Sequence, residues 1–184
     1  EQTSFNPSQS SKETLATVYF KDSDGAYSDI SSKINLGLNP FHYGGGGITS
    51  TLNDYLKILK FLLKSMKSDT KSSFVPQMFR NQIGNFGIPY LKSFNKGLAS
   101  DYYIYQNVEK SWGYGLIINN EPIAGKRPAE SGSWAGILNT YFWVDSKNDM
   151  AGVFLTQILP CYTPTILNAF ESFEELAYKR LIRS

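Results

Sequence analysis

Serine and lysine residues at helical spacing are the first candidates for chemistry in this sequence. Ser68 precedes Lys71 by three residues, Ser93 precedes Lys96 by three, and a Tyr-x-Asn triplet begins at Tyr105. A serine one helical turn from a desolvated lysine can become a nucleophile, because burial lowers the lysine pKa. Neither pair meets this condition, since Ser68 lies in a charged stretch and Ser93 in a stretch broken by glycine and proline. We therefore predict that none of these residues is catalytic.

Few other residues could support acid–base or metal chemistry. The chain has one histidine, His42, and one cysteine, Cys161, and no spaced cluster of ligands accompanies them. A Ser-His-Asp triad would have to use His42, whose position beside a run of glycines favours a loop role. Glu174 and Glu175 are expected on the solvated face of the last helix. The sequence therefore predicts no metal and no cofactor.

A run of four glycines at residues 44–47 directly precedes a predicted helix. It is not a P-loop, because no Gly-Lys-[ST] follows, and the local pattern favours a tight turn. Thr51 with Asp54 three residues later resembles a capping box. Apolar residues at three- and four-residue spacing predict one buried stripe on this helix, formed by Leu52, Tyr55, Leu56, Leu59, Leu62, Leu63 and Met66.

The second half of the chain predicts strands and a closing helix. A strand is expected over residues 112–118, where glycines on one face suggest the close approach of another segment or a ligand. A further strand is expected near residues 129–133, and a hairpin over 139–145 and 151–157. The last helix should begin with Thr163 and Pro164, and its expected buried stripe is Ile166, Phe170, Phe173, Ala177 and Leu181.

The other regions have weaker patterns. Residues 1–40 and 84–110 keep no period and are expected to be loops, with a short strand possible at 15–20. A short second helix is expected over residues 72–82. No internal repeat or linker divides the chain, which predicts a single domain. Its predicted helices and antiparallel strands indicate the α+β class.

Composition excludes several classes of protein. The 184 residues are 41% hydrophobic and carry a net charge of +2, which predicts a folded domain without a nucleic-acid or membrane partner. One cysteine and the lack of a glycosylation motif favour a cytoplasmic location. The chain begins at Glu1 and not at Met, so we expect a processed, engineered or partial chain.

Several segments together resemble one known family. They are Tyr43-Gly-Gly-Gly-Gly-Ile-Thr-Ser-Thr-Leu-Asn-Asp-Tyr, Trp112-Gly-Tyr-Gly-Leu, Ser131-Gly-Ser-Trp-Ala-Gly, Asn139-Thr-Tyr-Phe-Trp-Val-Asp and Gly152-Val-Phe-Leu-Thr-Gln. Their order resembles that of the β-lactamase-related serine hydrolases and transesterases, particularly the fungal branch. This family includes class C β-lactamases, serine esterases and D-alanyl-D-alanine peptidases.

The resemblance implies an antiparallel sheet flanked by helices, as in the β-lactamase/transpeptidase fold. Residues 1–184 would form the C-terminal part of one domain, with a helix and loop region at 1–110 and antiparallel strands and a closing helix at 111–184. The family's Ser-x-x-Lys nucleophile motif and its Tyr-x-Asn or Ser-x-Asn motif lie upstream of the glycine-rich turn. We therefore expect the nucleophile motif to be absent from this chain, which alone would be inactive, and part of the helix stripe to be left uncovered.

The resemblance also implies a substrate site. Glu130, Ser131 and Gly132 would stand where the family has Lys-Thr-Gly, and Ser133 would supply an oxyanion N–H group. Trp134 would either form a wall of the acyl pocket or belong to the core. The carboxylate of Glu130 would disfavour acidic substrates unless Lys126 or Arg127 restored positive charge.

Two classes of function remain open. The first is a serine acyl hydrolase or acyltransferase that acts on a small ester or amide through an acyl-enzyme. Its active site would need the N-terminal part of the same domain. The second is a catalytically inactive module of the same fold, kept for binding or scaffolding. A small binding domain unrelated to the family is a further alternative.

Overall fold

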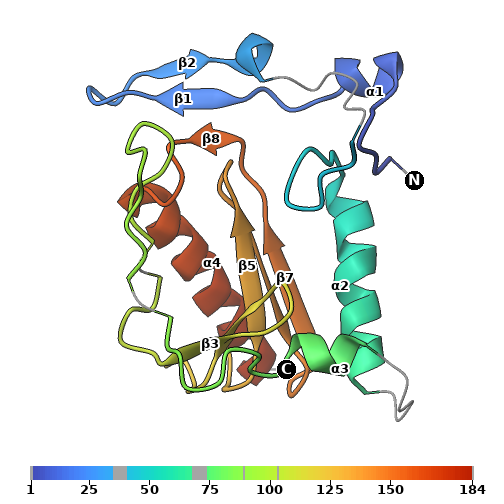
Figure 1. The fold of residues 1–184 in the computed structure, drawn as a ribbon, viewed down its shortest axis with the longest axis vertical. Helices are drawn as coiled ribbons and strands as arrows, with labels where there is room; N and C mark the ends of the chain where they lie inside the picture. Colours follow the sequence, from blue (N-terminus) through green and yellow to red (C-terminus); the bar gives the residue numbers. More distant parts are fainter. Residues whose placement is uncertain (1, 35–40, 68–73, 89, 103, 184) are drawn as a thin grey trace.

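A five-stranded antiparallel sheet with a long helix on each face forms the body of the molecule (Figure 1). The computed structural model describes residues 2–34, 41–67, 74–88, 90–102 and 104–183, the side chains of 181–183 excepted. Its α+β class agrees with the class predicted from the sequence. No helix in these ranges is long and apolar enough to cross a membrane.

The main sheet is a meander in which each strand pairs with the next along the chain. Its order is β3-β4-β5-β6-β7, and its strands are Lys110–Trp112, Ile117–Asn119, Gly132–Gly136, Thr140–Asp145 and Met150–Phe154. A smaller sheet of order β2-β1-β8, formed by Tyr27–Asp29, Tyr19–Lys21 and Ile158–Leu159, lies across one end (Figure 1). Its β1 and β8 are parallel, and all other paired strands are antiparallel.

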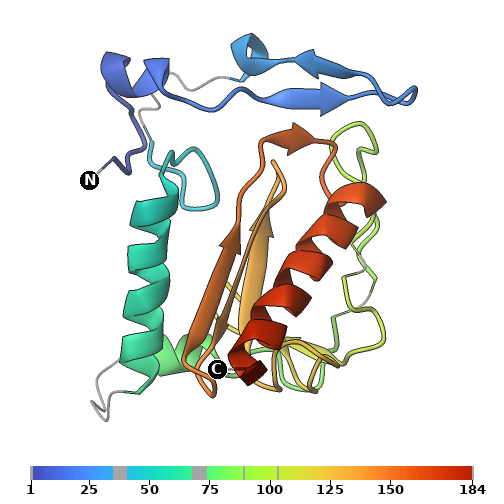
Figure 2. The same cartoon turned by 180° about the vertical axis from the view of Figure 1, so that it is seen from behind.

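The two long helices cover opposite faces of the main sheet. Helix α4 (Pro164–Arg183) covers one face (Figure 2). Its Phe170 ring packs there against Tyr141 and Trp143. Helix α2 (Leu52–Met66) packs through buried leucines against Val144 on the other face, together with the short α3 (Val75–Met78). The remaining helices are α1 (Gln9–Glu13) and the 3-10 turn η1 (Ser31–Lys33).

Helix α2 confirms its sequence prediction in bounds and cap. The Thr51 hydroxyl accepts a hydrogen bond from the Asp54 N–H at 3.2 Å. Of the predicted stripe, Leu59, Leu62 and Leu63 are buried and Tyr55, Leu56 and Met66 are half-buried, whereas Leu52 is 48% exposed. The stripe is therefore uncovered only at the N-terminal end of the helix. Two apolar residues outside it, Ile58 and Phe61, are also exposed.

The expected strand over residues 112–118 is wrong, because this segment is a hairpin. Trp112 of β3 pairs with Ile117 of β4, and the Gly113 N–H donates to the Leu116 carbonyl at 2.8 Å. Gly115 makes the turn with a φ of 74°, which favours glycine. The expected close approach at a glycine does occur, since a Cβ at Gly113 would lie 1.8 Å from the Met78 carbonyl oxygen.

Other element boundaries differ from the predictions by a few residues. The strand expected at 15–20 is β1, at Tyr19–Lys21, and the strand expected near 129–133 is β5, at Gly132–Gly136. The hairpin predicted over 139–157 is confirmed as β6 and β7. The helix expected over 72–82 is α3 at Val75–Met78, and residues 72 and 73 lie outside the described part. Helix α1 and strand β2 were not predicted from the sequence.

Candidate functional site

A cleft of about 340 Å³ opens on the α2 face of the main sheet. Helix α2 and the glycine-rich turn before it form one wall, and the ends of β5, β6 and β7 form the other. No charged residue of the described chain lines it. Its lining residues are Gly44, Gly45, Gly46, Ile48, Ser50, Thr51, Tyr55, Trp134, Ala135, Gly136, Thr140, Tyr141, Phe142, Val153, Leu155 and Gln157.

The strand register arranges the α2 face of the sheet in three rows. Trp134 of β5 pairs with Phe142 of β6, which pairs with Val153 of β7, and this middle row forms the floor of the cleft. Gly136 pairs with Thr140 in the upper row. The lower row, Gly132, Val144 and Ala151, does not line the cleft, because the core around Leu59 and Phe79 covers it.

Polarity changes along the depth of the cleft. The upper end carries the Thr140 hydroxyl, the Gln157 amide, and the hydroxyls of Ser50 and Thr51. Lower down, the Tyr55 ring packs on the Phe142 ring with centroids 5.6 Å apart. Burial raises the pKa of Tyr55 to about 12, so its hydroxyl stays neutral in the physiological range. The cleft is therefore an uncharged site with a polar mouth and an apolar floor.

The N-terminal segment holds the glycine-rich turn in place. Ser4 and Thr49 exchange backbone hydrogen bonds at 3.0 and 2.9 Å, and the Phe5 ring stacks on His42 with centroids 4.7 Å apart. The Asp54 carboxylate accepts from the Gln2 N–H at 2.6 Å. His42 thus has a packing role in this loop, which agrees with the role favoured by the sequence.

The opposite rim of the cleft, the turn between β5 and β6, is fixed by a buried asparagine. The Asn139 side-chain amide donates to the carbonyl oxygens of Ile158 and Pro160 at 2.7 and 3.0 Å. Its Oδ1 accepts from the Tyr141 hydroxyl at 2.6 Å and from the Tyr162 N–H at 2.9 Å. The rim is therefore anchored to β8 and the segment after it.

Cys161 lies behind the same rim. Its Sγ is 3.5 Å from the Gly136 carbonyl oxygen, and the residue is fully buried. Burial raises the pKa of the Cys161 thiol to about 11. The thiol therefore packs as a small apolar group and does not reach the cleft.

Of the five residues expected in the substrate site, only Trp134 lines the cleft. Glu130 has a φ of 72° and its exposed side chain pairs with Lys147 at 2.8 Å. The Ser131 hydroxyl donates to the Pro128 carbonyl at 2.8 Å. Gly132 is covered by the side chains of Phe79 and Leu116. Ser133 stands opposite Ile117 inside the β4–β5 ladder.

Trp134 is both a wall of the cleft and part of an aromatic cluster. Its ring makes an edge contact with Trp112 at 4.7 Å between centroids, and it lies 6.0 Å from the Tyr102 ring. The structure thus places Trp134 half-buried at the cleft and not among the residues of either core cluster.

Beyond Ser133, β5 has an open edge. The Asn119 N–H donates to the Ser131 carbonyl at 3.2 Å, so the backbone groups of Ser131 and, by alternation, of Ser133 and Ala135 point toward β4. Pairing with β4 ends at Ser133. No strand in the described part of the chain pairs with Ala135 on that side, and Ala135 lines the cleft.

The residues of the rejected serine motif have other partners in the structure. Lys96 forms an ion pair with Asp101, whose carboxylate also accepts from the Ser93 N–H at 2.8 Å. The Tyr105 hydroxyl donates to Glu174 at 2.6 Å. Ser93 lies outside any helix, and the Ser68–Lys71 pair lies outside the described residues.

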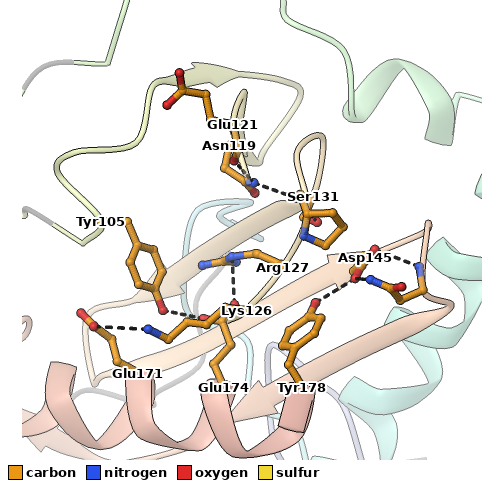
Figure 3. A network of polar contacts seen from close by, with 12 residues as sticks. Tyr105, Asn119, Glu121, Lys126, Arg127, Ser131, Asp145, Glu171, Glu174 and Tyr178 are labelled. Atoms are coloured by element: carbon orange, nitrogen blue, oxygen red, sulfur yellow. Dashed lines mark hydrogen bonds and ion pairs between the residues drawn. The ribbon is translucent and has the colours of Figure 1, made fainter. Parts of the chain in front are cut away.

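The expectation that Glu174 is solvated is wrong. Its side chain is 0% exposed and forms an ion pair with Arg127, itself 3% exposed, at 3.1 Å between Oε1 and Nε (Figure 3). Lys126 lies 3.8 Å from Glu171 and over the Tyr105 ring. The two cations that were expected to be able to reach the substrate site are thus held against α4. Glu175 lies on the exposed side, as predicted, beside Lys179.

Sequence reasoning missed the residues that form most of the cleft. Tyr55 was assigned to the core stripe, and Thr140, Phe142 and Val153 were predicted only as strand residues. Alternation within the predicted hairpin already puts these three side chains on one face. No cluster of His, Cys, Asp and Glu in the described chain could hold a metal ion.

Comparisons with known proteins agree with this fold. No family model matches the sequence. The chain is 25% identical over 142 residues to the lovastatin esterase of Penicillium rubens, covering 75% of this chain and 36% of that protein.

Among solved structures, the simvastatin synthase (LovD) of Aspergillus terreus superimposes on this chain. Its LovD6 mutant gives a TM-score of 0.82 at 19% identity, covering 100% of this chain and 47% of that one. The unliganded selenomethionyl protein gives 0.77 at 21% identity, covering 98% and 46%. The chain therefore spans about a third to a half of the length of these proteins. The β-lactamase/transpeptidase-like fold is confirmed, and so is the resemblance to β-lactamase-related esterases and transesterases.

Proposed function

We propose that this chain forms one wall of the active site of a serine acyl hydrolase or acyltransferase. The supporting observation is an uncharged cleft with an open strand edge at Ala135, in a fold shared with simvastatin synthase. A Ser-x-x-Lys segment upstream, in the N-terminal part of the same domain, would supply the nucleophile. The likeness to a lovastatin esterase favours a small-molecule ester as substrate.

The proposed reaction has two steps. The serine hydroxyl gives its proton to a general base of the upstream segment as its oxygen attacks the ester carbonyl carbon, and the carbonyl oxygen, as it becomes negative, accepts a hydrogen bond from the Ala135 N–H. The alcohol leaves and takes a proton from the general acid, which gives the acyl-enzyme. Water or a second alcohol then takes the acyl group and restores the serine. Ala135 suits this role better than Ser133, whose backbone faces Ile117 in the ladder.

The Ala135 assignment is testable with a proline. Proline lacks the N–H group, yet a strand edge tolerates it where that N–H faces away from a ladder. In a polypeptide that joins this chain to the upstream nucleophile segment, Ala135→Pro should lower kcat about 10²–10³-fold with little change in melting temperature. Ala135→Val keeps the N–H and is the control. Equal activity of the proline and valine variants would reject the assignment.

The proposal also predicts that the nucleophile lies outside this chain. A serine-reactive fluorophosphonate should leave the 184-residue chain unlabelled, because Lys96 pairs with Asp101 and the Ser93 hydroxyl, which accepts from the Asn95 N–H at 3.2 Å, lies outside any helix. Stoichiometric labelling that disappears in Ser93→Ala would place the nucleophile within the chain and overturn this part of the proposal.

We further propose that neutral esters are better substrates than acids such as penicillins. The cleft has no charged lining residue among those described, so no side chain there would offset the free-energy cost of desolvating a carboxylate. Glu130 is paired with Lys147 away from the cleft, so Glu130→Lys should leave the preference unchanged. The joined polypeptide should have a higher kcat/KM for a neutral nitrophenyl ester than for a chromogenic cephalosporin, and the reverse order would contradict the proposal.

A catalytically inactive binding module is the second candidate. It is favoured by the same lack of an activated serine among the described residues. The upstream sequence discriminates, because a binding module would lack a helical Ser-x-x-Lys motif.

A further inference from the structure

The cleft has an apolar floor and a polar upper end, so a bound molecule should enter it in one orientation. Its middle row is Trp134, Phe142 and Val153, and Tyr55 closes it from α2. The upper row and the glycine-rich turn supply hydroxyl, amide and backbone groups. Rows on a strand are two residues apart, about 7 Å. A ligand that fills the cleft must therefore present an apolar end about 7 Å from a polar one.

The bottom of the cleft is closed by well-packed residues. Beneath the middle row lies Val144, which is 0% exposed, within the core of α2 leucines. Val153 is half-buried and packs against that core. A longer apolar group cannot go deeper without displacing these side chains, which protein interiors resist.

We propose that the cleft binds the aliphatic chain of a neutral ester, and that Val153 limits the length of that chain. The chain would lie on Phe142 and Val153, with the ester group at the upper row beside the open edge of Ala135. This inference rests on the proposed acyl-transfer function for the identity of the polar end as an ester. None of the described residues that line the cleft is charged, so none of them can form an ion pair with a charged ligand end.

Binding to the 184-residue chain tests the inference without any turnover. The probes are methyl esters of straight-chain acids of increasing length, followed by tryptophan fluorescence, since Trp134 lines the cleft. Each methylene that reaches the floor should tighten binding about fourfold. The gain should stop once the chain fills the floor. The matching free carboxylates should bind at least tenfold more weakly.

Two variants test the role of Val153. Val153→Phe should lower affinity at least tenfold for the longer esters and leave the shortest ester within twofold. In Val153→Ala, the affinity should continue to rise up to longer chains before it levels off. Leu176→Phe, at an exposed position on α4, is the size-matched control and should change nothing. Circular dichroism should show that each variant is folded.

The outcomes separate this inference from the proposed function. No length dependence, or a Val153→Phe effect that is equal for all lengths, would overturn the role of Val153. Tight binding of the carboxylates would overturn the neutral-ligand assignment. If the length series behaves as expected but the joined polypeptide has no esterase activity, the chain-binding cleft stands and the acyl-transfer function fails.

Discussion

At Gly132 there is no room for a side chain. A Cβ there would lie 2.6 Å from Cε1 of Phe79 and 2.9 Å from Cδ1 of Leu116, both of which are buried. Gly132→Ala should therefore lower the free energy of unfolding by about 1–3 kcal/mol, as overpacked cores do. Urea denaturation measures this change.

The control for Gly132→Ala is Gly87→Ala, where no atom lies within 4 Å of the added Cβ. That substitution should leave stability unchanged or raise it by about 0.4–1 kcal/mol. A neutral Gly132→Ala would show that the glycine is not required by packing.

Single residues were the least predictable part of the site. A large ring among small residues needs a partner surface, and Trp134 lines the cleft. Glu130 was placed by alignment with a family motif, and that alignment cannot show the positive φ and the Lys147 ion pair that hold it elsewhere. The alanine side chain gives no sign of a chemical role. The possible role of the Ala135 N–H can be recognised only in the structure, because pairing with β4 ends at Ser133.

At the scale of elements, the first turn of α2 joins helix capping to the N-terminal segment. The Lys57 ammonium and the Gln2 N–H hold the pKa of Asp54 at about 2, below its ordinary 3.8. A carboxyl group whose pKa is lowered on folding stabilises the folded state at pH values above its ordinary pKa. That stabilisation is lost as the pH falls from 3.8 toward 2. Asp54→Asn should therefore remove this part of the acid dependence.

Urea denaturation over that pH interval checks the Asp54 prediction. The free energy of unfolding of the variant should fall less steeply with decreasing pH than that of the wild type. Glu13→Gln, on the exposed helix α1, should follow the wild-type curve. Parallel curves for Asp54→Asn and the wild type would mean that these contacts do not act in the folded state in solution.

Elements with a strong period were predicted well, and short ones were not. Helix α2 and the β6–β7 hairpin follow from three- and four-residue spacing and from alternation. The 112–118 segment also alternates, but Gly115 at positive φ reverses the chain and divides it between two strands. Strands of three residues such as β2 carry too few positions for a period to show. Their existence depends on partners that are distant in sequence.

At the scale of the whole molecule, one buried ion pair connects three distant segments. Tyr105 and Arg127 both meet Glu174, whose side chain is fully buried on α4 (Figure 3). Removing one partner of such a pair leaves the other charge buried without compensation. Glu174→Ala should therefore lower the free energy of unfolding by about 3–5 kcal/mol, measured by chemical denaturation.

The neighbouring glutamate supplies the matched control for Glu174. Glu175 is 43% exposed and its partner Lys179 is 58% exposed, so Glu175→Ala should cost less than about 1 kcal/mol. Replacing both Arg127 and Glu174 with apolar residues of similar size should recover much of the loss. Equal effects at 174 and 175 would mean that the pair does not hold the segments together. The predicted buried stripe of α4 contained Phe173 and not Glu174, but Phe173 is 39% exposed. Glu174 is buried in its place because Arg127, a partner distant in sequence, compensates its charge.

The buried thiol behind the cleft rim makes the chain well suited to site-specific labelling. Cys161 is the sole cysteine of the sequence, and a fully buried group with a pKa of about 11 presents almost no thiolate to a maleimide at neutral pH. A cysteine introduced at Leu155, which is 44% exposed on the cleft rim, would then be the single reactive position. A fluorophore or spin label attached there would report ligand entry into the cleft without removal of the native cysteine.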